Sequence, residues 1–376
     1  MQTLLYLMDR LGVGRDGGIV LPLKTLGGLR EFLRRWEGNL LFGTLGGVQE
    51  FEPGDPTVTA DWEQVPGLRC VGRLRSPREV AEIEADLVLA GVTHAGVASL
   101  QGADLPLVLL DDNSVGVRLR IARIETPSST DFARYALGHL RDRITVLSPM
   151  AREARGIQAN GFAAHHTYRR LNRNTLLYLD HRIDRTDVDA VAPRAREPGQ
   201  PLRLGFSGRL VALKGVRHLP HISRWLDQMG VPHSLTILGT GPELGALRDG
   251  APPHVRFLGH LDFEGQWKHW VRENLDVMVL PHIQGDSSST YYEALGSGVP
   301  VVAFANATSR PLAEASGAVA VVRRTRGAKG LAMAIAGLAA DARRWSDMRT
   351  SGLAFMAAHT VEHEFDRRVD HLRGCL

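Results

Sequence analysis

The sequence predicts an α/β protein of two domains, each built on a parallel sheet. Three observations lead to this fold class. The chain has 376 residues, which exceeds one ordinary domain core. Short apolar runs alternate with segments of helical periodicity, which is the rhythm of βα units. That rhythm stops at residues 189–203, which are rich in Pro and charge, and then starts again, so we expect two domains in tandem with a cleft between them.

The first domain is expected at residues 1–188. The run "TLLYLM" predicts a first strand, and Gly12, Gly14, Gly17 and Gly18 predict a loop after it. The spacing of apolar residues in "LKTLGGLREFLRRW" predicts a helix. The runs "ADLVLAGV", "LPLVLLDD" and "RITVLS" predict further strands, with helical stretches such as "DFARYALGHLRDR" between them.

The second domain is expected at residues 204–350, after a linker at 189–203. Helices are predicted near 216–230, 242–249 and 290–298. The predicted strands are "LRLGFSG", "HSLTILG", "VRFLG", "LDVMVLP", "PVVAF" and "AVAVV". Residues 351–376 predict a C-terminal helix, with Gly352 as a break, that runs back to the first domain.

Composition bounds the ligand and the compartment. The net charge is +4, and the positive excess lies beyond residue 188, because residues 1–188 hold equal numbers of acidic and basic side chains. This mild asymmetry suits an anionic small ligand in the second domain rather than nucleic acid, which needs a dense basic stripe with aromatics. Cys70 and Cys375 have neither disulfide nor zinc spacing, so a reducing cytoplasm is expected. The apolar start of the chain is too short for a signal peptide, and no run reaches the roughly 20 residues of a membrane span.

The stretch "GRLVALKG" holds Lys214, one of four lysines among 45 basic residues. A strand ends at Phe206 and a helix opens near Val216, so Arg209 and Lys214 are expected at the carboxyl edge of the sheet, where α/β proteins bind ligands. A helix start and the backbone amides that Gly208 leaves accessible also bind phosphate. Together with the two cations, they predict a diphosphate site. The alternative is a solvated pair of loop charges. The rarity of lysine favours the site, because a compact ammonium approaches a phosphate oxygen closely.

The stretch "LTILGTGPELGALR" predicts a turn from strand to helix. Gly239 and Gly241 let a ligand approach the backbone, and Pro242 suits the first turn of a helix. The pattern is not the dinucleotide fingerprint, because the third Gly and the later acidic residue are out of register. A tight turn with no ligand explains these residues equally well.

The stretch "PHIQGDSSSTYYEALGSGVPVVAF" begins where a buried strand ends at Pro281, and its short helix carries Glu293. Hydroxyls and backbone amides gather at the start of that helix, which suits phosphate or sugar oxygens. The residues that supply them are Ser287, Ser288, Ser289 and Thr290. The alternative is that they only cap the helix and form the loop.

In this order and spacing, the three stretches resemble the retaining glycosyltransferases of the GT-B fold, family four, also called glycosyl transferases group 1. That family has a "GRL…KG" loop, a "GxGP" turn and a "P-S-x-x-E" loop ending in "E-A-x-A-x-G-x-P-V-V". The resemblance covers about residues 203–322. It implies two Rossmann-like domains facing a cleft. It also implies that a sugar moves with retention from a nucleoside diphosphate donor to an acceptor hydroxyl, with neither a metal nor a cofactor.

The resemblance implies roles for residues of the second domain. Arg209 and Lys214 would hold the donor diphosphate, stabilise the departing charge and so act in catalysis. Glu293 would bind the ribose hydroxyls. The residues bordering the base would be Gly239, Gly241 and Pro242.

Two weaker matches lie in the first domain. Gly17 and Gly18 resemble the family's glycine loop over the phosphates. His94 in "AGVTHAG" resembles the family's His near the donor sugar, and on its own it is equally well explained as a hydrogen-bonded structural histidine.

The sequence departs from the family at two positions of the third stretch. The family spaces two glutamates with seven residues between them, and the first would fall on Gly285. Asp286 beside it is the expected replacement for the sugar-hydroxyl contact, and the amides and hydroxyls of "SSST" are the alternative. His282 takes the place of the family's Ser after Pro281.

Other candidate residues have a simpler interpretation. The "DVD" of residues 187–189 imitates a metal-binding triplet but lies at the linker, so we interpret it as a solvated turn. Asp111 and Asp112 follow a strand, where a cap or loop role is favoured over an acceptor-side carboxylate. The helix "LREFLRRW" is interpreted as core-packed with a basic outer face, in preference to a membrane-surface helix.

We therefore expect a bacterial glycosyltransferase that is cytoplasmic, with a peripheral position at the inner face of the membrane as the alternative. The acceptor would be a saccharide, as in polysaccharide biosynthesis, a glycolipid or a small molecule, and no nucleic acid takes part. One rival is a sugar-nucleotide epimerase of the GT-B fold, which would consume donor without acceptor. Another is a non-catalytic sugar-nucleotide-binding partner subunit, which would bind donor without turnover.

Overall fold

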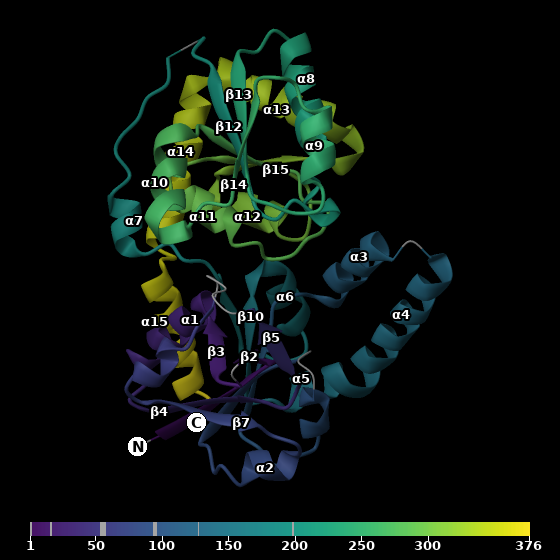
Figure 1. Cartoon of the computed structure of the whole chain (residues 1–376), viewed down its shortest axis with the longest axis vertical. Helices are drawn as coiled ribbons and strands as arrows, with labels where there is room; N and C mark the ends of the chain where they lie inside the picture. The colour runs from purple at the N-terminus through teal and green to yellow at the C-terminus, as the bar shows by residue number, and fades with distance from the viewer. Residues whose placement is uncertain (1, 16, 53–57, 93–95, 127, 198) are drawn as a thin grey trace. The chain divides into compact units, whose positions relative to one another are not determined.

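The chain forms two compact units in the computed structural model (Figure 1), which describes residues 2–15, 17–52, 58–92, 96–126, 128–197 and 199–376. The first unit comprises Met1–Val115, Ala133–Tyr178 and Glu362–Leu376. The second comprises Gly116–Phe132 and Leu179–Val361. Each unit has its own parallel sheet and its own buried side chains.

A seven-stranded parallel sheet forms the centre of the first unit, in the order β11-β10-β9-β8-β1-β4-β7. Its strands are β1 (Gln2–Met8), β4 (Gly38–Thr44), β7 (Leu68–Arg73), β8 (Leu87–Gly91), β9 (Leu107–Asp111), β10 (Gly156–Asn160) and β11 (Thr175–Tyr178). A small sheet of order β5-β2-β3-β6 joins β2 (Leu11–Gly14), β3 (Ile19–Pro22), β5 (Val48–Phe51) and β6 (Val58–Thr59).

Helices before residue 179 connect these strands, and the last helix of the chain returns to them. They are α1 (Leu23–Leu33), α2 (Pro77–Ala81), α3 (Val115–Glu125), α4 (Ser129–Asp142), α5 (Ser148–Glu153), α6 (Gly161–Tyr168) and α15 (Val361–Arg373). The apolar face of α1 is buried, and its Phe32 ring meets Phe365 of α15 edge-on, with centroids 5.0 Å apart. The predicted helix "LREFLRRW" therefore packs its apolar side inside the first unit.

Two local predictions for the first unit are wrong. The run "RITVLS" is not a strand, because Arg143–Leu147 form a π-helical turn that leads into α5. Gly12 and Gly14 lie in β2 rather than in a loop. A Cβ at Gly12 would approach the carbonyl oxygen of Val20 on β3 to 2.4 Å, so the glycine allows the two strands to pair.

The sheet of the second unit is parallel and has six strands, in the order β14-β13-β12-β15-β16-β17. The strands are β12 (Leu202–Ser207), β13 (His233–Leu238), β14 (Val255–Gly259), β15 (Val277–Leu280), β16 (Val301–Phe304) and β17 (Val319–Val322). All six were predicted. The chain proceeds outward from β12 in one direction and from β15 in the other, so the strand order reverses between these two strands. Such a switch point is where open α/β sheets bind ligands.

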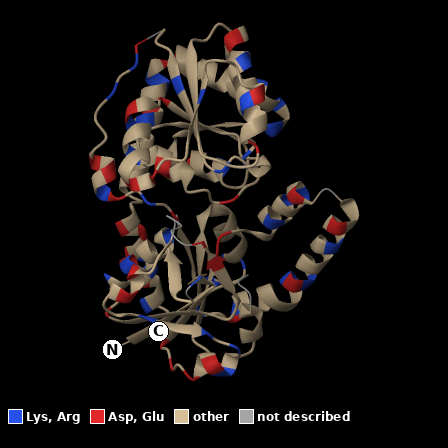
Figure 2. Cartoon of the chain, viewed as in Figure 1, with Lys and Arg blue, Asp and Glu red and all other residues tan. Residues whose placement is uncertain are grey.

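Helices surround this second sheet (Figure 1). They are α7 (Arg185–Asp189), α8 (His218–Gln228), α9 (Leu244–Gly250), α10 (Lys268–Asn274), α11 (Thr290–Gly296), α12 (Ser309–Ser316), α13 (Gly327–Ala340) and α14 (Ala342–Ala357). Large side chains such as Phe206, Phe304 and Trp345 are fully buried in the core. Charged side chains lie mainly on the helices and loops of both units, and the strands carry few of them (Figure 2).

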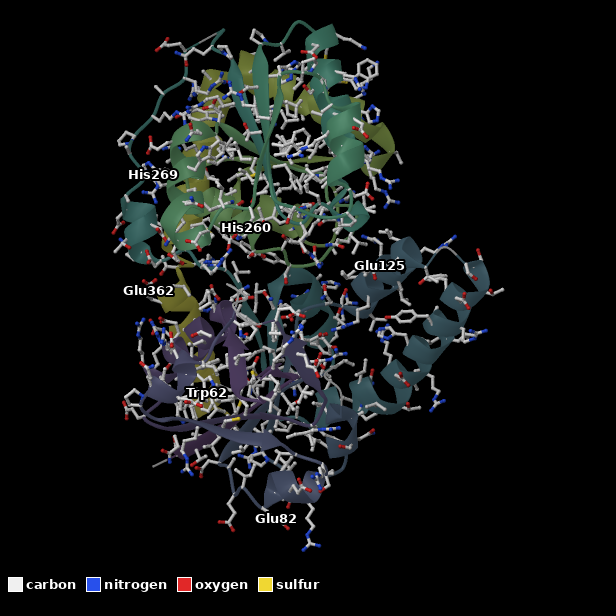
Figure 3. The ribbon with its side chains drawn as sticks, in the orientation of Figure 1. Trp62, Glu82, Glu125, His260, His269 and Glu362 are labelled. Atoms are coloured by element: carbon white, nitrogen blue, oxygen red, sulfur yellow. The ribbon has the colours of Figure 1, made fainter. Side chains whose placement is uncertain are left out.

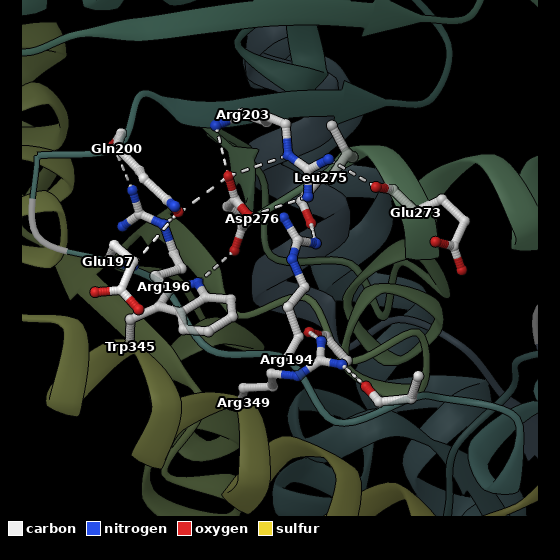
Figure 4. A network of polar contacts seen from close by, with 12 residues as sticks. Arg194, Arg196, Glu197, Gln200, Arg203, Glu273, Leu275, Asp276, Trp345 and Arg349 are labelled. Atoms are coloured by element: carbon white, nitrogen blue, oxygen red, sulfur yellow. Dashed lines mark hydrogen bonds and ion pairs between the residues drawn. The ribbon is translucent and has the colours of Figure 1, made fainter.

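The described residues of segment 189–203, predicted as a linker, include arginines that join a buried ion-pair network around Asp276 of the second unit (Figure 4). The Asp276 side chain is 4% exposed and accepts hydrogen bonds from the guanidinium groups of Arg194 and Arg203. Arg196 lies at 4.0 Å, and the Trp345 indole donates to the Asp276 carbonyl oxygen at 2.8 Å. The chain returns to the second unit at Leu179, before this segment begins.

The C-terminal segment differs from its prediction in one detail. Helix α14 continues through Gly352, and a Cβ there would lie 3.0 Å from the Cβ of Ala318, so the glycine serves close packing and not a break. The helix ends after Ala357, and α15 then belongs to the first unit. No helix of the described residues combines the length and apolar character that crossing a membrane requires.

Candidate functional site

Three loops follow the carboxyl ends of β12, β13 and β15, and they contain the three sequence stretches singled out above. The first loop carries Arg209 and Lys214, the second carries the "GTGPE" turn, and the third carries residues 281–289. Because β12 lies between β13 and β15, the first loop has a neighbour on each side. The three loops therefore meet at the switch point of the sheet.

The first two loops run backbone against backbone. The amide of Leu210 donates to the carbonyl oxygen of Thr240 at 2.8 Å, and the amide of Glu243 donates to that of Leu210 at 3.0 Å. A Cβ at Gly239 would lie 2.0 Å from the Gly208 carbonyl oxygen. Glycine is therefore required at 239 by the neighbouring loop, which is the structural explanation of the "GxGP" turn. Contact of Gly239, Gly241 and Pro242 with a base stays a prediction.

The first loop also contacts the third. Gly215 has φ +64°, and a Cβ there would lie 1.9 Å from the carbonyl oxygen of Pro281. The amide of Ile283 donates to the carbonyl oxygen of Leu213 at 3.2 Å. This close approach fixes the residue before the glycine, Lys214, against the loop that follows β15.

The ammonium of Lys214 lies between two oxygens of the third loop. Its Nζ is 3.3 Å from Asp286 Oδ2 and 3.1 Å from Ser288 Oγ. The side chain is 14% exposed. Burial lowers the pKa of Lys214, the carboxylate of Asp286 opposes that shift, and the charge of Arg209 adds to it. The structure thus brings together Lys214, Asp286 and Ser288 from two separate stretches, while Arg209 is exposed.

The backbone of the third loop explains why glycine occupies position 285. A Cβ at Gly285 would lie 3.0 Å from both the Cβ and the amide nitrogen of Ala307. The hydroxyl oxygen of Thr308 lies 3.0 Å from the carbonyl oxygen of Gly285 and 2.9 Å from that of Asp286. A longer side chain at 285 would therefore have to displace Ala307. The carboxylate that reaches Lys214 is that of Asp286.

His282, at the family's Ser position, is a buried neutral imidazole. Its side chain packs edge-on against Phe206 and Tyr291, with centroid distances of 6.4 and 5.4 Å. Burial and the nearby Lys214 ammonium hold the pKa of His282 well below its usual range. Neither ring nitrogen has a hydrogen-bond partner among the described residues. The residue therefore fills space beneath the third loop and carries no charge at neutral pH.

Glu293 lies on α11 and its carboxylate is buried. Arg182 donates to Glu293 Oε1 at 3.0 Å, and its guanidinium lies 3.5 Å from the ring centroid of Phe263. Sequence reasoning missed Arg182, because it lies outside every motif and reaches Glu293 only through the fold. The ribose contact of Glu293 stays a prediction.

The hydroxyl residues at the start of α11 are half-buried. Ser288 contacts Lys214, as described above. Ser289 precedes the helix without a side-chain capping bond, so the alternative interpretation that it caps α11 is not supported. Ser287 and Thr290 complete the predicted set, and their contact with a ligand stays a prediction.

Among the described residues of the first unit, the candidate residues form no comparable cluster. Gly17 and Gly18 lie at the tip of the β2–β3 hairpin, where the amide of Gly14 donates to the carbonyl oxygen of Gly18 at 2.8 Å. His94 lies outside the described residues. Asp112 accepts a hydrogen bond from Asn160 at 3.1 Å, and Asp111 is the buried last residue of β9.

The "DVD" stretch is not the solvated turn that its sequence suggested. Asp187 is buried on α7, completes a capping box with Asp184 and binds Lys268 at 2.9 Å. Its partner comes from a distant segment, so the local sequence could not reveal it. Asp189 pairs with Arg185 at the surface.

An arginine-lined hollow of about 340 Å³ adjoins the third loop. Ile283 and Ala305 form its apolar part. The other lining residues are Arg120, Arg310, Arg323, Arg324 and Thr325. Among the described residues, no carboxylate forms an ion pair with these four arginines. Cations gathered around a hollow without counter-charges favour an anionic ligand.

Residues 201–341 match the family model described as glycosyl transferases group 1. No curated protein matches the sequence.

Solved structures resemble the whole chain at low sequence identity. Alr3699/HepE from Anabaena, solved in complex with UDP, is 15% identical over 100% of both chains, with a TM-score of 0.62. Sucrose-phosphate synthase from Thermosynechococcus elongatus is 15% identical over 99% of this chain and 98% of its own, with a TM-score of 0.67. WaaG, a glycosyltransferase involved in lipopolysaccharide biosynthesis, is 10% identical over 98% of both chains, with a TM-score of 0.62. The shared fold is GT-B, with two Rossmann-like domains, as predicted.

Proposed function

Because residues 201–341 match the family model of the glycosyl transferases group 1, we propose that the protein is a glycosyltransferase that moves a sugar with retention from a nucleoside diphosphate donor to an acceptor hydroxyl. The observation that carries this proposal is the position of Lys214 at the switch point of the sheet, on the loop that also bears Arg209. A diphosphate there would meet two cations without any metal ion.

The arrangement suits the departure of a diphosphate. When the bond between the sugar and the β-phosphate breaks, negative charge develops on the departing phosphate oxygen. Fixed cations stabilise that charge more in the transition state than in the ground state, which accelerates the reaction. Lys214 is preorganised for this role, because Asp286 and Ser288 hold its ammonium in place.

The contacts of Lys214 also explain why this position holds lysine in an arginine-rich chain. An ammonium has three donors on a compact centre, so two can bind Asp286 and Ser288 while the third points to a ligand oxygen. A planar guanidinium spreads its donors over a fixed fork and does not offer the same compact point charge.

When the transfer takes place in a single step, retention means that the acceptor oxygen attacks the face of the sugar from which the diphosphate leaves. In the proposed step the acceptor hydroxyl forms the new C–O bond while the old bond breaks. A phosphate oxygen of the leaving group takes the hydroxyl proton. No protein carboxylate is then needed as the general base. In this proposal Asp286, beside Lys214, orients a hydroxyl of the donor sugar.

The donor nucleotide proposed first is UDP. This choice is supported by the structural likeness to Alr3699/HepE, which has been solved with UDP and with UDP-glucose. Glu293 would hold the ribose, and its orientation is fixed by Arg182. The four arginines around the hollow beside Ile283 support an acceptor or donor sugar that carries an anionic group.

The acceptor class is proposed to be a saccharide, a glycolipid or a small molecule, used in the cytoplasm or at the inner face of the membrane. The likeness to WaaG, which is involved in lipopolysaccharide biosynthesis, supports a cell-surface saccharide first.

The experiment is an NMR assay of purified protein with UDP-sugars, with and without mixtures of saccharide acceptors. The proposal predicts acceptor-dependent loss of donor and a product with the anomeric configuration of the donor. Donor consumed equally without acceptor, with an epimerised sugar released, would favour the epimerase. Donor bound but unchanged under every condition would favour the non-catalytic binding subunit.

A further inference from the structure

The amino edge of the second unit's sheet carries two histidines and an aspartate that the proposed transfer does not use. His233 is the first residue of β13, His254 directly precedes β14, and Asp227 lies on α8. The donor loops follow the carboxyl ends of the strands, so this cluster lies at the opposite edge of the same sheet. We propose that Asp227, His233 and His254 form a binding site for a divalent transition metal ion, and that their donor set fits Zn²⁺.

The three side chains already converge. One ligand atom from each lies within 4.8 Å of the other two. Asp227 Oδ1 is 3.7 Å from His254 Nε2. The imidazole rings of His233 and His254 pack in a T-shaped arrangement at 84°, with centroids 5.2 Å apart. Ligand atoms about 2.1 Å from a tetrahedral Zn²⁺ lie about 3.4 Å from one another, so binding needs side-chain shifts of about 1 Å.

The hydroxyl of Ser223 marks the point of convergence. Ser223 is fully buried, and its Oγ lies 2.8 Å from His233 Nε2 and 2.9 Å from His254 Nε2. Ser223 and Asp227 are one helical turn apart on α8, so both face the strands. A hydroxyl has a single proton and can donate to only one of the two nitrogens. A metal ion here would accept a lone pair from both Nε2 atoms. With Asp227 as the third ligand, the Ser223 hydroxyl or a water would be the fourth.

His233 is held in the form that binds a metal. Its Nδ1 lies 2.9 Å from the carbonyl oxygen of Val231, which only accepts hydrogen bonds. Nδ1 therefore carries the proton, and the lone pair of Nε2 points toward Ser223. Metal-binding histidines typically have this arrangement, with the second ring nitrogen donating to a carbonyl or carboxylate.

The site is open to solvent on one side. The side chains of His254 and Asp227 are 41% and 47% exposed, so an ion can enter and both side chains can rotate toward it. A bound ion would join α8 to the starts of β13 and β14. Since it binds the folded state, it would stabilise the second unit by mass action without contacting the donor loops.

The test is a calorimetric titration of ZnCl₂ into the full chain. The protein carries no histidine tag and is first stripped of metal with EDTA. Thermal unfolding is followed in the same samples. We expect one saturable site per chain and a higher Tm with Zn²⁺. His254→Ala and Asp227→Asn should each weaken binding about tenfold or more. His269→Ala is the matched control, because His269 on α10 is an exposed histidine outside the cluster (Figure 3) and should leave binding unchanged.

Two results would overturn the site: no saturable Zn²⁺ binding by the wild type, or binding that survives unchanged in both His254→Ala and Asp227→Asn. Asp227→Asn separates loss of metal binding from loss of folding. It alters an exposed carboxylate, so the variant should keep the wild-type Tm in EDTA. UDP binding is measured on the same samples. If Zn²⁺ binds as expected and UDP does not, the metal site stands and the proposed transferase function fails.

Discussion

Lys214 Nζ lies 3.3 Å from Asp286 Oδ2, and the two residues are 72 positions apart in the sequence. Their loops follow β12 and β15, the two strands between which the order of the sheet reverses. The pair therefore joins the loops of two of the sequence stretches at the place where an α/β sheet binds its ligand. A diphosphate bound there would share the ammonium with Asp286.

Replacing Lys214 by Ala tests the phosphate contact. We expect Lys214→Ala to weaken UDP binding about 10- to 100-fold, because a hydrogen bond to a charged group contributes about 1.5–3 kcal/mol. The measurement is isothermal titration with UDP. Lys329→Ala is the control, since Lys329 is an exposed lysine on α13 that lies over the Trp225 ring. Equal UDP affinity in Lys214→Ala and Lys329→Ala would remove the phosphate assignment.

Asp286→Asn separates nucleotide binding from sugar positioning. The carboxylate repels a diphosphate beside Lys214, so its neutralisation should leave UDP affinity equal or higher. The same change should lower kcat about 10-fold or more, because the contact with the sugar hydroxyl loses its charge. UDP titration and donor turnover are compared with Asp249→Asn, an exposed carboxylate on α9. A large loss of UDP affinity in Asp286→Asn would mean that this carboxylate builds the phosphate site and does not serve the sugar.

The buried imidazole of His282 predicts a pH dependence of stability. Its pKa is lowered in the folded protein, so the unfolded chain takes up a proton at a higher pH than the folded chain does. The free energy of unfolding that depends on the neutral ring is fully present above about pH 6.5, the pKa of histidine in the unfolded chain. It is lost as the pH falls toward the lower pKa of His282 in the folded protein. The loss approaches about 1.4 kcal/mol per pH unit.

Urea unfolding at pH 7.5 and 5.5 measures this effect. The wild type should lose about 1 kcal/mol more than His282→Gln between the two values, since glutamine does not titrate. His165, His218 and His371 also have lowered pKa values, but both proteins contain them. Parallel pH profiles of the two proteins would contradict the account of His282.

The network around Asp276 predicts a strong effect on stability. Asp276→Asn leaves Arg196, whose side chain is 3% exposed, without its counter-charge. Breaking a buried pair in this way costs about 3–5 kcal/mol in the free energy of unfolding. Asp347→Asn removes one partner of a surface pair with Arg343 and should change stability by less than about 1 kcal/mol. Similar unfolding curves for the two variants would show that segment 189–203 does not depend on Asp276.

The fold and the donor loops of the second unit could be predicted because their signals are local. Each strand there is a short apolar run bounded by Gly or Pro, and the carboxyl ends of parallel strands share one edge. Lys214 and Asp286 were therefore both expected at the donor site, although their contact was not predicted. The strand predicted at "RITVLS" was wrong, because a short apolar run fits a strand and a buried helical turn equally well.

Interactions between distant segments could not be predicted. Residues 189–203 have the composition of a solvated linker, but Asp276, far along the chain, supplies the buried charge that holds their arginines. Arg182 and Asp187 have distant partners in the same way, Glu293 and Lys268. Nor did cysteine spacing reveal the His233 and His254 cluster, because it contains no cysteine and no short motif.

The most direct test of the central claim is a calorimetric titration of the wild-type chain with UDP, GDP, ADP and dTDP, followed by turnover of the matching sugar donor. The account predicts that one nucleoside diphosphate binds at a single site, that Lys214→Ala weakens it, and that its sugar form is slowly consumed and faster with an acceptor. If none of the four nucleotides binds, the loops that hold Arg209, Lys214 and Glu293 are not a donor site.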